Sequence, residues 1–280
     1  MPPVREALAD AADRLRAVTD TPEFEAALLA RHAWGWSRAR LVLDAREPAD
    51  TASLEPLIRR RLSAEPIAYI LGRWEFFSID LAVEAPLLVP RPETEHLVEA
   101  AIRHLGQRPA RVLDLCTGTG CVAIAIARNA PVSGIVATDI HPVALRVAAS
   151  NAAEYGIPLD VRPGDLFAAL ADGAAPFDVI VSNPPYVAET AWDTLAPDIR
   201  NFEDRGALLS GPDGLDCIRR IVRDAPLWLS PGGMLALEMG EEQGAVARAL
   251  FTERGFRDVS IRQDLAGHDR VITGVWGAGA

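Results

Sequence analysis

The sequence predicts an α/β protein in which a small helical bundle precedes a doubly wound, mostly parallel sheet of seven strands. Three observations lead to this prediction. Helical patterns alone occupy residues 1–72, a stretch resembling a β-hairpin follows at 73–90, and strand and helix signals alternate from 91–280. With 280 residues, 49% of them hydrophobic, the chain is long enough for two domains that each bury a core. We therefore expect boundaries near residues 72 and 90.

Residues 1–72 show four helical patterns and no strand-like alternation. In the second pattern, Thr21 is a plausible N-cap and Pro22 fits the first helical position. We expect a bundle that presents a surface to a macromolecule, with Trp34 and Trp36 packing in its core rather than anchoring an interface. The run of three arginines at 59–61 fits a solvated helix face better than a docking contact. The predicted helices span 4–18, 22–36, 38–45 and 52–62.

In the second part of the chain, apolar residues alternate through the connector 73–90, and Pro90 and Pro92 then stiffen the exit into a helix ending near Leu105. Helical patterns fill most intervals between the later strands, which predicts parallel pairing. The interval 264–269 is too short for a crossover, so we expect the last strand to run antiparallel. The predicted strands are 111–116, 134–139, 158–162, 177–182, 233–239, 256–264 and 270–276.

A glycine-rich turn follows the first of these strands. Thr117, Gly118, Thr119 and Gly120 lie between the strand and an apolar helix, as in nucleotide-binding units, where glycines let a ligand approach the backbone. A dinucleotide fingerprint would place a third glycine at residue 123 and a first glycine at residue 116, where this chain has alanine and cysteine. The turn therefore favours a nucleoside ligand over a pyrophosphate.

Two aspartates follow the next strands. Asp139 ends the strand-like run that comes after Gly120, where a carboxylate can accept both hydroxyls of a ribose, although it also fits a cap before the helix that starts at His141 and Pro142. Asp165 can accept from an adenine amino group or cap a helix over 166–170. Both aspartates lie at predicted carboxyl ends of strands, where such sheets bind ligands.

The fourth strand ends in Asn183, Pro184, Pro185 and Tyr186. Asn183 brings a carboxamide that both accepts and donates hydrogen bonds, and the prolines fix the backbone and leave their carbonyls free. A planar NH2 group fits across these acceptors. Taken alone, the tripeptide also fits a rigid turn.

Charge and composition point to an intracellular enzyme. The net charge of −11 falls mainly on the part of the chain after position 72, which argues against a nucleic-acid enzyme and suits a cationic cofactor and a protein substrate with basic flanks. All 28 basic residues are arginines, and we infer no function from this bias. We expect no signal peptide and no membrane span, because the segment 1–15 is charged and no apolar run approaches the length of a membrane-spanning helix. A cytoplasmic location follows as an expectation.

The cysteines and histidines show no spacing for a metal site or a catalytic triad. We therefore predict that the chain binds no metal and that these residues have structural roles. We interpret the cysteines as small hydrophobic residues without disulfides. They are Cys116, Cys121, Cys217, His32, His96, His104, His141 and His268.

The glycine turn with Asp114, Asp139 and the segment from Asn183 to Tyr186 resembles S-adenosylmethionine-dependent methyltransferases that act on a planar nitrogen. Residues 66–76, 89–95 and 202–216 narrow the resemblance to the release factor glutamine methyltransferases, the PrmC/HemK family. The resemblance covers residue 60 to the end. It implies a class I Rossmann-like methyltransferase fold with S-adenosylmethionine as cofactor. The chain departs from the family at Cys116, where glycine is common, and at Leu166, where an aromatic residue is frequent.

The resemblance also implies roles for the candidate residues. Asn183, Pro184 and Tyr186 would be catalytic, and with Pro185 they would bind the substrate amide. The cofactor would bind Cys116, Thr117, Gly118, Thr119, Gly120, Asp139, Asp165, Leu166 and Asn183. Glu93 and Thr94 would close over the cofactor or only cap the following helix, and Glu238 would contribute no more than a wall.

The function expected from this resemblance is methylation of the glutamine in the Gly-Gly-Gln loop of class 1 peptide chain release factors. No stable nucleic-acid or membrane partner is expected. Two alternatives remain. The same chemistry fits a ribosomal protein glutamine or a nucleic-acid adenine, and a non-catalytic binding module would keep the fold without turnover.

Overall fold

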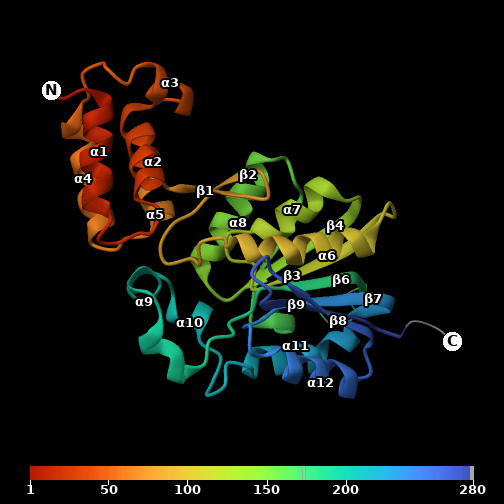
Figure 1. Ribbon diagram of the computed structural model, residues 1–280. Helices are drawn as coiled ribbons and strands as arrows, with labels where there is room; N and C mark the ends of the chain where they lie inside the picture. The colour runs from red at the N-terminus through yellow and green to blue at the C-terminus, as the bar shows by residue number, and fades with distance from the viewer. Residues whose placement is uncertain (172, 174, 278–280) are drawn as a thin grey trace. The chain divides into compact units, whose positions relative to one another are not determined.

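The computed structural model describes residues 1–171, 173 and 175–277, which form two compact units. The first unit comprises Met1–Arg73 together with Ala196–Phe202, and the second contains the rest of the described chain. Figure 1 labels the elements of both units. Each unit encloses hydrophobic clusters of its own. No helix within the described ranges is long and apolar enough to cross a bilayer.

The first unit is helical, as predicted. The helix α2 ends two residues earlier than expected because Gly35 adopts a left-handed conformation (φ 63°) that terminates it. Thr21 occupies the N-cap position of α2, but its side chain makes no capping bond. Trp34 and Trp36 pack edge to face at the border of the core. The helices are α1 (Val4–Leu15), α2 (Pro22–Trp34), α3 (Arg38–Leu43), α4 (Thr51–Leu62), α5 (Ile67–Leu71) and α9 (Pro197–Phe202).

A buried ion pair crosses the first unit. The guanidinium of Arg61 on α4 donates to both carboxylate oxygens of Glu25 on α2, at 2.6 and 3.3 Å, and also to the carbonyl of Val18. Only 6% and 9% of these two side chains are exposed. The expectation of a solvated face is therefore wrong for Arg61, whereas the neighbouring Arg59 side chain is 75% exposed.

The second unit is built on a seven-stranded sheet in the order β5-β4-β3-β6-β7-β9-β8. β9 pairs antiparallel with both β7 and β8, and the other pairings are parallel, which confirms the predicted topology. β7 begins earlier than predicted, because Leu229 already pairs with Phe177 before an irregularity in the register. The strands are β3 (Ala110–Leu115), β4 (Val132–Asp139), β5 (Leu159–Pro163), β6 (Phe177–Ser182), β7 (Leu229–Glu238), β8 (Arg257–Gln263) and β9 (Asp269–Val275).

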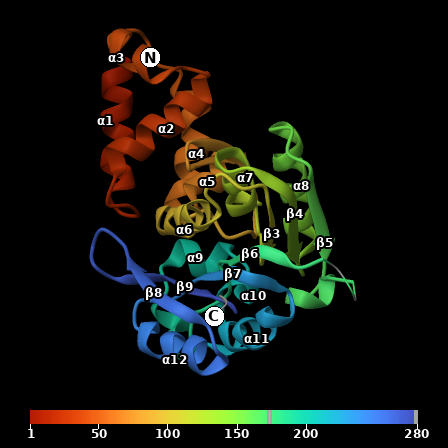
Figure 2. The same cartoon turned by 90° about the vertical axis from the view of Figure 1, so that its right-hand side faces the viewer.

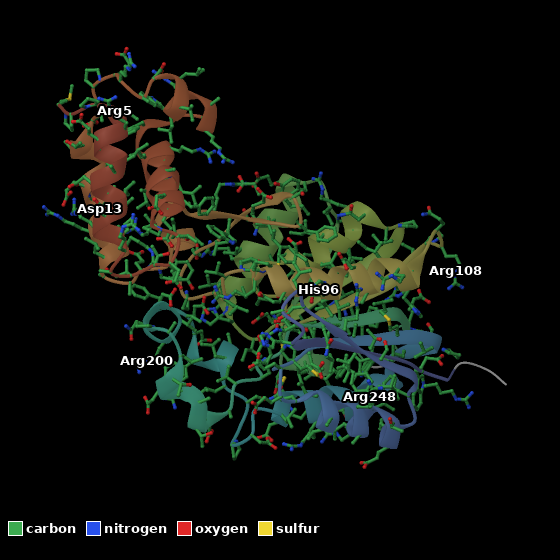
Figure 3. All side chains as sticks on the ribbon, in the orientation of Figure 1. Arg5, Asp13, His96, Arg108, Arg200 and Arg248 are labelled. Carbon is green, nitrogen blue, oxygen red and sulfur yellow. The ribbon has the colours of Figure 1, made fainter. Side chains whose placement is uncertain are left out.

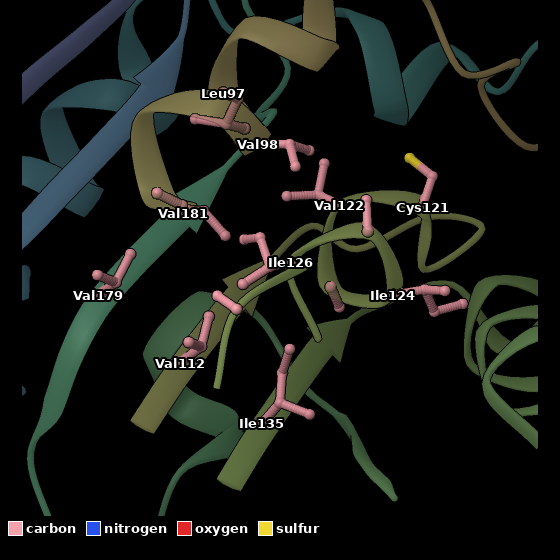
Figure 4. Packing of buried hydrophobic residues seen from close by; sticks show 14 of the residues in the cluster. Leu97, Val98, Val112, Cys121, Val122, Ile124, Ile126, Ile135, Val179 and Val181 are labelled. Atoms are coloured by element: carbon pink, nitrogen blue, oxygen red, sulfur yellow. The ribbon is translucent and has the colours of Figure 1, made fainter. Parts of the chain in front are cut away.

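Helices cover both faces of this sheet, which Figures 1 and 2 show from two sides. Because side chains alternate along a strand, Val112 and Val179 face α6 (Glu95–Leu105), α7 (Cys121–Asn129) and α8 (Pro142–Glu154), as Figure 4 shows in part. Leu113 and Ile180 face α11 (Asp216–Asp224) and α12 (Gly244–Arg254). Both faces of the central strands are therefore buried, as in doubly wound sheets.

Within residues 73–90, the stretch 73–82 forms a two-stranded hairpin, β1 (Arg73–Phe76) and β2 (Ile79–Ala82). Leu81 and Phe76 of the hairpin pack into the cluster beneath α6 and α7. A 3-10 turn at Pro92–Thr94 leads into α6. The short elements are α10 (Arg205–Leu208) and the 3-10 segments Leu166–Ala169, Glu189–Thr194 and Ala225–Leu227.

Charged side chains, Arg248 of α12 among them, lie over the outside of the units (Figure 3).

The buried ion pair predicts how the first unit responds to loss of one charge. Arg61→Met should lower the free energy of unfolding by about 3–5 kcal/mol, because Glu25 is left as an unpaired buried charge. Arg59→Met on the same helix is the matched control and should cost at most about 1 kcal/mol. Denaturant titration of both variants measures the difference, and equal small losses would contradict the role assigned to the pair.

Candidate active site

A cavity of about 420 Å³ opens in the second unit where the parallel strands end. The segments that follow β3, β4, β5 and β6 all contribute to its wall, as expected for the carboxyl edge of such a sheet. Most of the candidate residues lie together around it: Cys116, Thr117, Gly118, Thr119, Asp139, Asp165, Leu166, Asn183 and Pro185. Three others, Gly120, Pro184 and Tyr186, follow in the chain but are not lining residues.

The two glycines of the turn serve different purposes. Gly118 (φ 56°) and Gly120 (φ 81°) are both left-handed, the conformation that favours glycine. A Cβ on Gly118 would meet no atom within 4 Å, whereas on Gly120 it would lie 3.1 Å from Cβ of Ala148 on α8. Gly118 therefore keeps the backbone open toward the cavity, and Gly120 allows close packing of α8.

Asn151 is a residue of this region that the sequence did not single out. It is fully buried on α8, and its Nδ2 donates to the Thr119 carbonyl at 2.9 Å and to the Ala82 carbonyl at 3.0 Å. Its Oδ1 accepts from the Ala82 N–H at 2.9 Å. One carboxamide thus fastens the glycine turn to both α8 and the hairpin. Its partners lie far away in sequence, so local patterns gave no signal for it.

Asp139 connects the turn to the start of α8. Its Oδ2 accepts from the Gly118 N–H at 3.0 Å and its Oδ1 from the His141 N–H at 2.9 Å. The N-cap of α8 is His141, whose Nδ1 accepts from Val143, so Asp139 itself is not that cap. Because each carboxylate oxygen accepts one bond, each keeps capacity for a ligand hydroxyl.

Asp114 is a second carboxylate at the cavity, and sequence reasoning gave it no role in the site. It is buried at the end of β3, and its Oδ2 accepts from the Thr117 hydroxyl at 2.6 Å. Burial raises the pKa of Asp114 to about 7, against the lowering effect of its hydrogen bonds, and the nearby charge of Asp139 adds to the increase. A cation in the cavity would favour the ionised form. The sequence feature that could have pointed to Asp114 is a carboxylate within an otherwise apolar strand.

The segment after β5 supplies a polar and an apolar wall. Asp165 stands before a 3-10 turn, but its side chain makes no capping bond, so the capping interpretation is not supported. Its Oδ2 accepts from Arg220 on α11 at 2.6 Å. Leu166 is buried in a left-handed conformation (φ 53°) and lines the cavity together with Leu87 and Ala144.

Asn183 follows β6 directly, and its carboxamide nitrogen is held by a neighbouring hydroxyl. Nδ2 donates to Oγ1 of Thr94 at 3.3 Å, and within the described chain no hydrogen bond is made to Oδ1. Thr94, which closes the turn before α6, is buried and lines the same cavity. The amide oxygen of Asn183 is therefore the atom left to accept a hydrogen from a ligand.

Tyr186 lies beyond the two prolines, against the cluster under α11 and α12. Its hydroxyl donates to Oε1 of Glu238, at the end of β7, at 3.1 Å. Burial, and then the charge of Glu238, raise the pKa of the Tyr186 phenol far above its ordinary range. Pro184 is buried, and Pro185 is in contact with the cavity.

Two segments distant in sequence meet beside the cavity. Oε1 of Glu203 accepts from the guanidinium of Arg91 at 2.6 Å and from the Val89 N–H at 3.3 Å. Glu203 is buried. This carboxylate joins the segment 89–95 to the segment 202–216, the two stretches that carry much of the family resemblance.

All three cysteines lie at the cavity and none forms a disulfide. Burial raises the pKa of Cys121 to about 12, so this thiol is an inert core group. A hydrogen bond with Cys217, followed by burial, raises the pKa of Cys116. Within the described ranges, no group of histidine, cysteine, aspartate and glutamate residues is arranged to hold a metal ion.

Comparisons with known proteins find relatives over most of the chain. The family model for the PrmC N-terminal domain matches residues 6–72, and that for the methyltransferase small domain matches residues 94–199. The release factor glutamine methyltransferase of Bordetella pertussis is 44% identical over 257 residues, covering 90% of this chain and 94% of the relative. Those of Cereibacter sphaeroides and Xylella fastidiosa strain Temecula1 are each 41% identical over 276 residues, covering 94% and 97%, and 98% and 98%.

Solved structures show the same fold at low identity. A methyltransferase from Pyrococcus furiosus is similar with a TM-score of 0.53 and 17% identity, over 73% of this chain and 91% of that one. The 16S rRNA N2 G1207 methyltransferase of T. thermophilus, solved with AdoMet and guanosine, has a TM-score of 0.53 and 20% identity, over 72% and 49%. The predicted Rossmann-like methyltransferase fold is confirmed.

The raised pKa of Asp114 predicts a stability that falls as pH rises. The folded chain favours the neutral acid, so stability is full below the ordinary pKa of 3.8 and is lost as pH approaches about 7. Asp114→Asn should raise the free energy of unfolding near pH 8 by up to about 4 kcal/mol and leave it unchanged near pH 4.

Thermal unfolding across this pH range measures the effect. Asp160→Asn, on the exposed side of β5 and paired with Arg162, is the control and should keep the pH dependence of the parent. An Asp114→Asn variant with the parent's pH profile would contradict the neutral state of the acid.

Proposed function

This chain belongs to the family of release factor glutamine methyltransferases, and from that premise we propose that it methylates the side-chain amide of the glutamine in the Gly-Gly-Gln loop of class 1 peptide chain release factors. The methyl donor in this proposal is S-adenosylmethionine. The observation that carries the proposal is Asn183: its Nδ2 is held by Thr94 and its Oδ1 is free at the cavity.

The cavity fits the proposed donor. Two carboxylates, Asp114 and Asp139, suit a cationic sulfonium, and Asp139 keeps acceptor capacity for ribose hydroxyls. Gly118 leaves open space at the turn, where the bases and sugars of nucleosides approach the backbone closely. When bound, S-adenosylmethionine supplies an electrophilic methyl group.

Different residues of the cavity are proposed to contact different parts of the donor. Asp165 has one oxygen on Arg220, which leaves the other for an adenine amino group, beside the apolar side chain of Leu166. The remaining proposed cofactor contacts come from Cys116, Thr117, Thr119, Gly120 and Asn183.

The chemistry follows from the weak nucleophile. A glutamine amide nitrogen shares its lone pair with the carbonyl and is nearly non-basic, so methylation depends on placement more than on a strong base. Oδ1 of Asn183 and the carbonyl of Pro184 would accept the two amide hydrogens. Tyr186 would pack against the amide plane, with its hydroxyl anchored on Glu238.

These acceptors favour the transition state over the ground state. Transfer of the methyl group to the amide nitrogen would release the demethylated donor and would place positive charge on the two N–H hydrogens. Hydrogen bonds from those hydrogens to Asn183 and Pro184 therefore strengthen. The nitrogen would then lose one proton to solvent, which converts the primary amide into a secondary N-methyl amide.

We assign recognition of the protein substrate to the N-terminal helical domain, residues 1–72. Large apolar side chains are exposed there, Phe24 on α2 and Val42 and Leu43 on α3, and they suit contact with a folded partner. The acidic charge of the chain suits a protein with basic flanks. Cytoplasmic location, where translation takes place, belongs to the same proposal.

Labelled methyl transfer tests the substrate directly. Purified protein with radiolabelled S-adenosylmethionine should label a class 1 release factor at the Gly-Gly-Gln loop, because that loop presents the glutamine amide. A factor with this glutamine replaced should stay unlabelled. Ribosomal proteins and DNA serve as comparison substrates. Equal labelling of the substituted factor, or preferential labelling of either comparison substrate, would contradict the assignment of the release factor glutamine as substrate.

Substitution of Asn183 separates substrate chemistry from cofactor binding. Asn183→Ala should lower kcat by at least about 100-fold, because one acceptor of the amide hydrogens is lost, while donor affinity falls much less. Asn129→Ala, whose side chain only bonds the Ala125 carbonyl within α7, is the control. Single-turnover kinetics and calorimetry give the two readouts. Complete loss of donor binding in Asn183→Ala would contradict this division.

A further inference from the structure

A glutamine outside the cavity wall holds the far end of the segment from Asn183 to Tyr186. Gln243 occupies the N-cap position of α12, shortly after β7 ends. Its Nε2 donates to the Tyr186 carbonyl at 2.9 Å and to the Asp213 carbonyl at 3.3 Å, and its Oε1 accepts from the Gly240 N–H at 2.9 Å. Because Tyr186 lies 57 residues away in sequence, no local pattern pointed to Gln243.

These hydrogen bonds fix the direction of the Gln243 carboxamide. A glutamine amide has an oxygen that only accepts and an NH2 group that only donates. The Gly240 N–H must therefore face Oε1, which leaves the NH2 group facing the carbonyls of Tyr186 and Asp213. A flipped amide would set donor against donor and oxygen against oxygen. Gln243 thus links the end of β7 to the Tyr186 backbone in a single orientation.

The segment that carries the proposed acceptors is held at both ends. At one end, Asn183 directly follows the strand β6. At the other end, the Tyr186 carbonyl accepts from Gln243. Pro184 and Pro185 lie between these ends and have fixed φ angles, so few torsions remain that can turn the Pro184 carbonyl. The direction of that carbonyl therefore depends on where the Tyr186 end is held.

The backbone around the Tyr186 carbonyl is closely packed. A Cβ on Gly214 would lie 2.2 Å from the Tyr186 oxygen and 2.8 Å from Nε2 of Gln243. The neighbouring Val187 carbonyl accepts from the Ser210 N–H at 2.9 Å. Loss of the Gln243 NH2 group would leave a carbonyl that is covered by protein and lacks this donor, so the segment would have to shift to satisfy it.

We propose that Gln243 is a positioning residue that directs the Pro184 carbonyl toward the substrate amide by holding the Tyr186 carbonyl. This role rests on the proposed function, in which Pro184 accepts one of the two amide hydrogens. It adds to that function a side chain that touches neither the donor nor the substrate.

Kinetics of two substitutions at Gln243 test this role. Gln243→Leu removes all three hydrogen bonds, whereas Gln243→Glu keeps an acceptor for Gly240 but turns a carboxylate oxygen toward the Tyr186 carbonyl. Both should lower kcat by about 10- to 100-fold, because the Pro184 carbonyl loses its direction, with donor affinity within about threefold of the parent. If Gln243 served only to bind Gly240, Gln243→Glu would keep the parent's kcat.

The pH dependence of Gln243→Glu gives a second readout. A protonated carboxyl can again donate to the Tyr186 carbonyl, so the deficit in kcat relative to the parent should shrink as pH falls from about 8 to about 5. Gln243→Leu should show no such recovery. The matched control is Gln263→Glu, at the exposed end of β8, where the side chain donates to Asp269 at 2.9 Å. The control should keep the parent's kcat at every pH.

Hydrogen exchange separates this role from the substrate assignment. The Val187 N–H, next to Tyr186, donates to the Leu208 carbonyl at 2.8 Å. By nuclear magnetic resonance, this amide should exchange at least about tenfold faster in Gln243→Leu than in the parent, and at the parent's rate in Gln263→Glu. The measurement needs no release factor. If the parent does not label release factor, the proposed function fails while the exchange rates still decide whether Gln243 holds the segment.

Three results would overturn the role of Gln243. The first is the parent's kcat in Gln243→Leu and Gln243→Glu proteins that are folded by circular dichroism. The second is a deficit of Gln243→Glu that stays constant as pH falls. The third is an unchanged exchange rate of the Val187 amide in Gln243→Leu. Any of these would reduce Gln243 to the first residue of α12.

Discussion

One hydrogen bond holds together the edge on which the cavity depends. The Ser182 hydroxyl at the end of β6 donates to the Leu115 carbonyl at the end of β3 at 2.7 Å, and the same two residues are partners in the parallel register. The next residues along the two strands are Asn183 and Cys116. Because the strands stop at the same level, the carboxamide and the glycine turn enter one cavity, and a shift of register would separate them.

Much of this arrangement follows from local sequence. The strands are short apolar runs, the turn carries glycines, and both features predict a parallel sheet with a ligand at its carboxyl edge. Asp139 and Asn183 were therefore expected at the edge from their positions alone. The close approach of Gly120 to α8, where a Cβ would lie 3.1 Å from Ala148, had no local signal in the sequence.

The remaining features depend on partners far apart in the chain. Thr94 meets Asn183 across 89 residues, and Asn151 meets Ala82 across 69. Asp114 and Glu238 stand at the ends of apolar strands, where sequence alone does not reveal their altered proton affinity, because burial and neighbouring charges determine it. The ion pair of Arg61 and Glu25 was also missed, because its partners lie far apart in the chain and a run of arginines usually faces solvent.

The left-handed conformation of Cys116 has a consequence for how the edge tolerates change. A side chain in that region costs about 1–2 kcal/mol relative to its relaxed backbone, and glycine would avoid the cost. The thiol offsets part of it by packing against Cys217 and the cluster beneath the sheet. Replacing this cysteine by glycine would therefore exchange torsional strain for a small void in the wall of the cavity, leaving net stability nearly level while loosening the packing of that wall.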